Sequence, residues 1–143
     1  MADLNPLIRV RKHTVEQKQK FLAELYRQAD ELQNHKAALQ RQMKEERDAL
    51  EKMNTVDMIA AFSTYVEAVK ERISDIDEAM KKLETRIEIA REDMREAFAE
   101  FKKIEITQER REAEEYRAIE KKQAELLDEA ALDGFRRRMV EDN

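Results

Sequence analysis

Apolar side chains recur every three or four residues from Ile59 to Ile104 without interruption. Fourteen positions over seven heptads follow this spacing, and every one of them is apolar. They are Ile59, Phe62, Val66, Val69, Ile73, Ile76, Met80, Leu83, Ile87, Ala90, Met94, Ala97, Phe101 and Ile104. A seven-residue repeat keeps one stripe of a helix facing a partner only when the helices supercoil. The repeat therefore predicts a long helix in a coiled coil, with a seam that ends at Ile104.

The first half of the chain carries a weaker seam with the same spacing. Ten of its fourteen positions are apolar. They are Ile8, Val15, Leu22, Leu25, Ala29, Leu32, Leu39, Met43, Leu50 and Met53. Arg11, Lys18, Lys36 and Glu46 fill the other four. We expect Lys18 and Lys36 to lay their stems along the seam while their ammonium groups reach water.

A fold-back near Val56 brings the two seams into register. It pairs residues whose numbers sum to 112, such as Leu22 with Ala90 and Met53 with Ile59. We expect helices at about 4–53 and 58–133, a turn at about 54–57 and a basic tail at 134–143. Either Asn54 together with Asp57, or Thr55 alone, could cap the second helix. A dimer with one continuous helix in each chain is the alternative arrangement.

The predicted fold class is all-α: a long two-helix antiparallel coiled-coil hairpin with an overhanging C-terminal helical extension. Composition agrees, because 43% of the residues are charged and the chain has one glycine and one proline. Turns and loops need glycine and proline, and these two residues are almost absent. We expect residues 1–143 to form a single elongated domain, with Gly134 as the C-terminal stop of the second helix.

Most kinds of active site are excluded by the residues available. One glycine cannot form a phosphate-binding loop, and no cysteine is present for a thiolate site. His13 and His35 lie 22 residues apart on one predicted helix, about 33 Å along its axis. We therefore expect no catalytic residues, no metal and no cofactor.

Charge and hydropathy limit the partners as well. The net charge of −5 and the lack of aromatic residues among the basic runs argue against nucleic acid. No apolar run approaches the roughly 20 residues that span a bilayer, so we expect no membrane insertion. The chain is expected to be cytoplasmic and monomeric when free.

Two surfaces are candidates for protein contacts. Val56, Met58, Ala60, Ala61 and Tyr65 form an apolar surplus near the turn, which either docks a partner or closes the hairpin. Beyond Ile104 the second helix has no counterpart in the first. A shifted, poorer stripe runs there through Tyr116, Ile119, Leu126 and Ala130, and it needs a partner to be buried.

The chain resembles the FliJ family of flagellar export proteins, whose relatives serve virulence type III secretion. The resemblance rests on the opening stripe of Leu4, Ile8, Val15, Leu22 and Leu25, and on three later segments. These are Phe101-Lys102-Lys103-Ile104-Glu105, Glu125-Leu126-Leu127-Asp128-Glu129-Ala130 and Phe135-Arg136-Arg137. Any long, charged coiled coil shares part of this pattern, so a structural dimer or a scaffold protein unrelated to secretion is the alternative.

The resemblance implies a stalk or adaptor at the cytoplasmic face of the inner membrane. Its partners would be the export ATPase ring, the membrane export gate and the export chaperones. The residues that it implies for the ring are Leu4, Ile8, Arg9, Arg11, Lys12, Tyr116, Ile119, Leu126, Leu127 and Phe135. Phe62 and Tyr65 are the residues suggested for the export gate.

Overall fold

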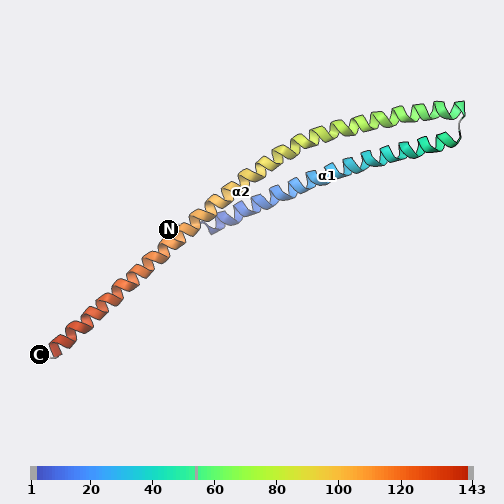
Figure 1. Ribbon diagram of the computed structural model, residues 1–143. Coiled ribbons are helices and arrows are strands. Elements are labelled where there is room, and N and C mark those ends of the chain that lie inside the picture. Colours follow the sequence, from blue (N-terminus) through green and yellow to red (C-terminus); the bar gives the residue numbers. More distant parts are fainter. Residues whose placement is uncertain (1–2, 54, 142–143) are drawn as a thin grey trace. The chain divides into compact units, whose positions relative to one another are not determined.

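Two long helices account for almost all of the chain. The computed structural model describes residues 3–53 and 55–141. Helix α1 spans Asn5–Lys52, helix α2 spans Val56–Glu141, and the described residues contain no strand (Figure 1). The predicted fold class, an all-α hairpin of two long helices, is confirmed.

Contacts divide the chain into two compact units. One is His13–Phe98, which we call the hairpin unit. The other combines Met1–Lys12 with Ala99–Asn143, and we call it the terminal unit. Both helices contribute to each unit. That residues 1–143 form one domain stays a prediction.

Short polar side chains accept hydrogen bonds from backbone N–H groups at the starts of both helices. The N–H of Asn5 donates to Oδ1 of Asp3 at 3.0 Å, and Pro6 occupies the first turn, where no helical N–H is needed. At the second helix, Oγ1 of Thr55 accepts a hydrogen bond from the N–H of Met58 at 3.3 Å. Thr55 is thus the cap of α2. Asn54, the other predicted cap, lies outside the described residues.

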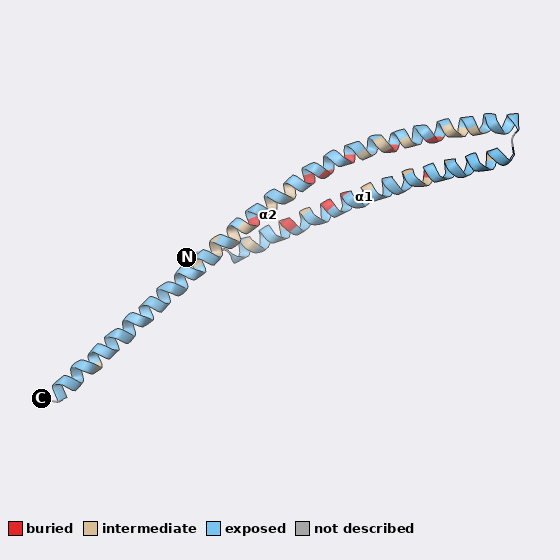
Figure 2. Cartoon of the chain, in the orientation of Figure 1, coloured by how far each residue is buried: buried red, intermediate tan, exposed pale blue. Residues whose placement is uncertain are grey.

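The core of the hairpin unit consists of two apolar clusters where α1 and α2 face each other (Figure 2). The first cluster contains Leu22, Leu25, Leu83, Ile87 and Ala90. The second contains Leu39, Val69 and Ile76, with Met43 and Ile73 packed against it. Both members of the predicted pairs Leu22–Ala90, Leu25–Ile87 and Leu39–Ile73 lie in the same cluster. This distribution agrees with a register in which paired numbers sum to 112.

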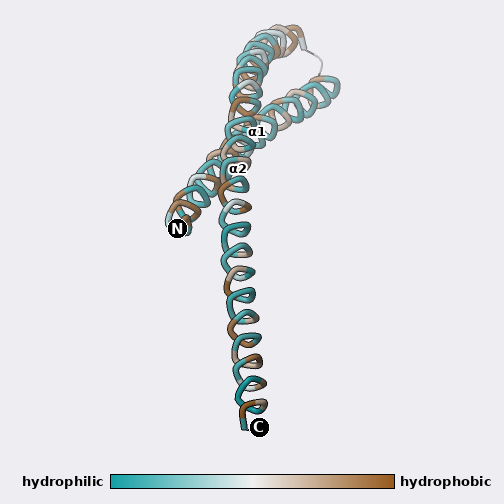
Figure 3. Tube along the Cα trace, turned by 90° about the vertical axis from the view of Figure 1, so that its left-hand side faces the viewer, coloured by the Kyte–Doolittle hydropathy of each residue, from teal (hydrophilic) through white to brown (hydrophobic). Residues whose placement is uncertain are grey.

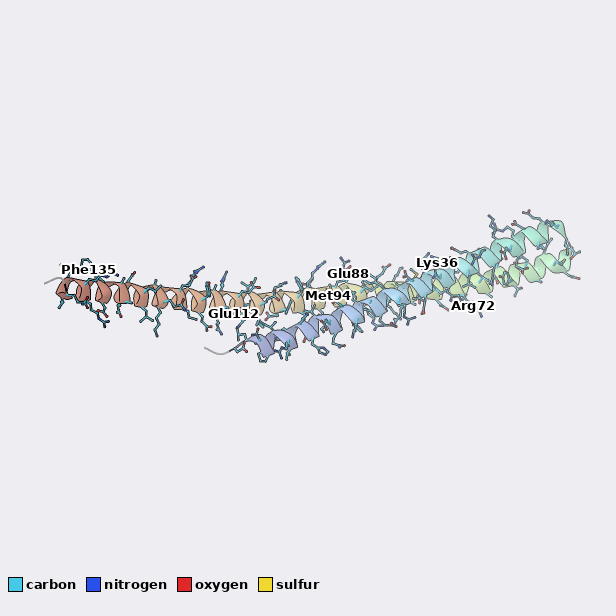
Figure 4. The ribbon with its side chains drawn as sticks, turned by 90° about the horizontal axis from the view of Figure 1, so that it is seen from below. Lys36, Arg72, Glu88, Met94, Glu112 and Phe135 are labelled. Carbon is cyan, nitrogen blue, oxygen red and sulfur yellow. The ribbon has the colours of Figure 1, made fainter. Side chains whose placement is uncertain are left out.

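Lys36 occupies a polar position in the seam of the hairpin unit, between apolar layers. Its Nζ donates to Oδ1 of Asp77 on α2 at 2.7 Å, and both side chains are partly buried. Figure 4 marks the position of Lys36 on α1. The stem therefore lies in the seam while the ammonium group is paired across it. A charge pair at one place in an apolar seam favours a single register over its slipped alternatives.

The last predicted layer, at the turn, is not buried. Met53 and Ile59 are both exposed, although the register pairs them. Helix α1 ends at Lys52, so Met53 lies beyond the last helical residue, and no further turn of α1 covers Ile59. This predicted pair is therefore not part of the buried core.

In the terminal unit, the start of the chain packs against α2 in the same register. The N–H of Leu4 donates to Oε1 of Gln108 at 3.2 Å, and these numbers again sum to 112. Phe101 is buried there, and Ile8 and Ile104 are half-buried. The pairing thus extends one turn beyond Ile104, the predicted end of the seam.

Gly134 does not end α2, contrary to our expectation. The helix continues through it to Glu141, and no described glycine has a positive φ. A glycine stop requires the left-handed conformation after the last turn. Here the residues that follow, from Phe135 to Met139, are compatible with a helix, so Gly134 keeps helical dihedrals. The described part of the basic tail is therefore helical as well.

No helix among residues 3–53 and 55–141 is both long enough and apolar enough to cross a membrane.

Candidate functional site

An apolar groove lies at the closed end of the hairpin unit, and we call it the tip groove. Its volume is about 510 Å³. It is lined by Glu46, Ala49, Leu50 and Met53 from the α1 side and by Met58, Ala61, Phe62 and Tyr65 from α2. In each set the numbers follow the spacing i, i+3, i+4, i+7, which places the helical residues of the set on one face. Met53 directly follows the end of α1. The groove is thus a paired surface made by two matching faces.

The sequence explains why this groove is open and apolar. Leu50 and Phe62 belong to the seam, whereas Ala49, Ala61 and Tyr65 form a second apolar row beside it. The two alanines fill little space, so the row does not close over the seam. The rings of Phe62 and Tyr65 lie 6.4 Å apart at an angle of 37°. Both predicted gate residues are thus half-buried in the wall of one groove.

The second candidate surface is α2 from residue 112 to 141, which we call the tail. Every residue in it is exposed except Gly134, which is intermediate. Apolar bands nevertheless recur along it (Figure 3). The large apolar side chains of the tail have exposed fractions between 54% and 76%. They are Tyr116, Ile119, Leu126, Leu127, Leu132, Phe135, Met139 and Val140.

The residues predicted for the ATPase ring all lie in the terminal unit. Leu4 and Ile8 are half-buried, whereas Arg9, Arg11 and Lys12 are exposed. Tyr116, Ile119, Leu126, Leu127 and Phe135 are exposed along the tail, and Figure 4 marks the position of Phe135. The first group therefore contributes mainly cations to the surface, and the second group contributes apolar side chains.

Sequence reasoning missed Leu132, Met139 and Val140 as candidate contact residues. They are exposed on helix α2 on either side of Gly134. A helix stop at Gly134 would separate Leu132 from Met139, whereas the continuous helix places them on one face. The spacing of Leu132, Phe135 and Met139, at i, i+3 and i+7, was the signal that could have found them.

The clearest electrostatic perturbation lies away from both surfaces, on the exposed side of α1. Arg27 pairs with Glu24 one turn before it and with Glu31 one turn after it. The hydrogen bond from the Arg27 guanidinium lowers the pKa of Glu24, and the pairing with Glu24 raises the pKa of Arg27. These are ordinary pairs between successive turns of an exposed helix.

The two surfaces present exposed apolar and charged side chains. Within residues 3–53 and 55–141, no polar or charged side chain is buried. In the same ranges, no group of three His, Cys, Asp or Glu side chains is placed to hold a metal ion. What the described residues present is an apolar groove with one glutamate in its lining and a long helical face of mixed charge.

Comparison with protein families gives a match that covers almost the whole chain. A family model described as flagellar FliJ protein matches residues 1–140. No curated protein and no solved structure matches the chain. The matched range includes both helices almost entirely, with the tip groove and nearly all of the tail. The chain therefore belongs to the flagellar FliJ family, and its role is connected with flagellar protein export.

Proposed function

We propose that this protein is a non-enzymatic stalk and adaptor of the flagellar export apparatus. In this proposal the terminal unit associates with the ring-shaped export ATPase, and the tip groove contacts the membrane export gate. The same adaptor assists the export chaperones in handling their substrates. The observation that carries the proposal is the tail, a continuous helix whose large apolar side chains are all exposed.

The exposed apolar side chains of the tail support the proposal that a partner covers this part of α2. Soluble proteins rarely leave a long series of large apolar side chains uncovered unless another molecule covers them. The apolar side chains of the tail are supported by no second helix, because every tail residue except Gly134 is exposed. The cations Arg9, Arg11 and Lys12 belong to the same unit and extend the proposed contact surface.

The proposed mechanism is asymmetric contact. A single helix at the centre of a ring cannot touch all subunits equally, so it stabilises one state in some subunits and another state in the others. Only such a difference in contact free energy shifts a conformational equilibrium. The chain would thereby bias the ATPase cycle without taking part in hydrolysis.

The experiment is the hydrolysis rate of the purified export ATPase ring with and without the chain. We expect the unmodified chain to stimulate hydrolysis and the double variant Leu126→Ser/Leu127→Ser to lose most of that stimulation. Ile89→Ser is the matched control, because Ile89 is 58% exposed and Leu126 is 57% exposed, but Ile89 lies in the hairpin unit. If the double variant stimulated hydrolysis as much as the unmodified chain does, the proposal that the tail contacts the ATPase ring would be refuted.

The gate contact has its own test. We expect Ala61→Asp, which places a charge inside the tip groove, to weaken binding to the cytoplasmic domain of the export gate protein. The same change should leave stimulation of the ATPase unaltered, since Ala61 is exposed and lies in the other unit. Unchanged gate binding in this variant would remove Phe62 and Tyr65 from the proposed contact.

A further inference from the structure

The hairpin unit leaves its own apolar seam uncovered near the turn. Leu39 on α1 and Val69 on α2 are the buried residues nearest to the turn. Between them, none of the described residues 40–53 and 55–68 is buried, although the apolar seam spacing continues there. Figure 2 shows this change along both helices, from buried positions to half-buried and exposed ones. The tip groove is therefore an apolar surface that this unit does not cover itself.

The charges around the tip groove are mostly acidic. Glu46 belongs to its lining, and the exposed carboxylates Glu45 and Asp57 each precede a lining residue. Residues 44–68 contain six acidic and three basic residues, which gives a net charge of −3. Like charges would repel each other if two copies of this end met, which disfavours a contact between two tip grooves. A complementary occupant is both apolar and basic.

The last part of the tail, residues 132–141, has these two properties, and we call it the C-terminal segment. Leu132, Phe135 and Met139 are exposed, and their spacing of i, i+3 and i+7 places them on one face of α2. Successive residues of an α-helix are rotated by about 100°, so Arg136 and Arg138 lie about 70° to one side and about 90° to the other side of the centre of this face. The apolar face is thus flanked by cations.

The acidic residues of the C-terminal segment lie away from this face. On the same geometry, Asp133 and Glu141 are about 130° and about 150° from its centre. The apolar face from Leu132 to Met139 and the α2 wall of the tip groove from Met58 to Tyr65 both span eight residues, about 10 Å along a helix axis. Groove and segment therefore agree in length and are opposite in charge.

We propose that the tip groove of one copy of the chain binds the C-terminal segment of a second copy. The apolar face of the segment lies in the groove, and its arginines lie beside Glu45, Glu46 and Asp57. The occupant belongs to a second copy because groove and segment share one unbroken helix, Val56–Glu141. A chain therefore cannot fold this segment back onto its own groove.

This contact goes beyond the proposed function and does not depend on it. A single short helix buries less surface than the roughly 1,200–2,000 Å² of a stable complex, so we expect the contact to be weak and reversible. It covers two apolar surfaces that would otherwise both face water in the free chain. The expectation that the free chain is monomeric then holds only at low concentration. The proposed partners use the same two surfaces, so self-association and partner binding would exclude each other.

Sedimentation velocity of the full-length chain over a series of concentrations tests this proposal. We expect the mean mass of the unmodified chain to rise with concentration. Ala61→Asp places a carboxylate in an acidic groove, and Phe135→Ser removes an apolar side chain from the segment. Each should weaken self-association by roughly tenfold. Glu46→Arg should weaken it too, because it replaces an acid of the groove with a base.

The control is matched to Phe135 in exposure. Ile89→Ser should associate like the unmodified chain, because Ile89 is 58% exposed and Phe135 is 60% exposed, but Ile89 lies outside the groove and the segment. Circular dichroism checks that each variant keeps its helix content.

A mixture of two variants distinguishes this contact from a symmetric one. The Ala61→Asp copy has an impaired groove and an intact segment, whereas the Phe135→Ser copy has an intact groove and an impaired segment. We expect each variant alone to stay monomeric at a concentration where the unmodified chain associates. At that concentration, the mixture of the two should form pairs with one copy of each.

Three results would overturn the inference. One is an unmodified chain that stays monomeric up to about 1 mM, which would mean that the groove and the segment have no useful affinity. Another is a loss of association in only one of the two variants, which would mean that two like surfaces meet. The third is a mixture that stays monomeric. The test contains neither the ATPase ring nor the gate protein, so a failure here leaves the proposed function standing.

Discussion

The hairpin unit and the tail contain similar apolar residues, which are buried in the first and exposed in the second. Leu25 in the hairpin unit is 1% exposed, whereas Leu127 in the tail is 71% exposed. Both residues lie within regular α-helices. The difference is the helix that covers Leu25 and is missing at Leu127. Apolar spacing therefore predicts where a helix forms a contact surface, but the identity of the covering partner determines whether that surface contributes to folding.

The two regions also differ in what stabilises their helices. In the hairpin unit, the clusters around Leu25 and Leu39 are buried between two chain segments. In the tail, helix formation depends on backbone hydrogen bonds and on residues of high helix propensity such as alanine, leucine, glutamate and lysine. Tertiary packing supplies most helical stability in proteins. The tail is therefore expected to be the less stable region.

The largest expected effect is the contrast between Leu25→Ala and Leu127→Ala. Truncating a buried leucine costs about 2–5 kcal/mol through lost burial and the resulting cavity. Truncating an exposed leucine changes the free energy of unfolding by about 0.5 kcal/mol or less. Urea unfolding followed by circular dichroism measures both. We expect the order to be reversed for binding to the ATPase ring.

Two results would contradict the expected difference between Leu25→Ala and Leu127→Ala. If Leu127→Ala destabilised the free chain as much as Leu25→Ala, the tail would be packed against another part of the protein in solution. If Leu25→Ala left the free energy of unfolding unchanged, the first apolar cluster would not hold the hairpin together. Leu22→Ala, in the same cluster, provides a second substitution for this test.

An effect of intermediate size is expected for Gly134→Ala in the tail. Gly134 has a negative φ, and a Cβ at this position meets nothing within 4 Å. Replacing glycine by alanine in a helix interior therefore stabilises the helix by about 1 kcal/mol. Amide hydrogen exchange of residues 130–141 should slow by about fivefold, since 1 kcal/mol corresponds to that factor. Exchange around Leu25 is the internal control and should not change.

Most of the fold could be predicted from the sequence because seam positions leave few choices. The paired numbers that sum to 112 fix the hairpin, and the Leu4–Gln108 hydrogen bond obeys the same sum. The end of α2 was not predictable from Gly134, because a lone glycine is compatible with both a stop and a continuing helix. The exposure of Met53 and Ile59 was not predictable either, because a rule that pairs residue numbers does not say where helix α1 ends.

The candidate surfaces were predictable only in part. Spacing identified Tyr116, Ile119 and Leu126, because they form a shifted stripe at intervals of three and seven residues beyond the end of the seam. The tip groove depends on where Ala49 and Ala61 leave space beside Phe62, and a linear pattern does not contain that volume. The face shared by Leu132, Phe135 and Met139 depends on the continuation of α2 through Gly134. Surfaces that require a three-dimensional arrangement were therefore the ones that sequence reasoning missed.

The smallest expected effect concerns the pH dependence of the Glu24–Arg27 pair, which lies on one helix of the hairpin unit. The Arg27 guanidinium lowers the pKa of Glu24 below its ordinary value of 4.5. A carboxyl with a lowered pKa in the folded state stabilises that state above its unfolded pKa. This contribution is lost as the pH falls through the lowered folded value.

We expect a carbon-detected NMR titration of Glu24 to have its midpoint below 4.5, and Arg27→Ala to return it toward 4.5. Because both residues lie on α1 one turn apart, Leu25→Ala should leave the midpoint unchanged wherever the chain is still folded. A midpoint that moved with Leu25→Ala would mean that packing against α2, rather than the local helix, holds the pair together.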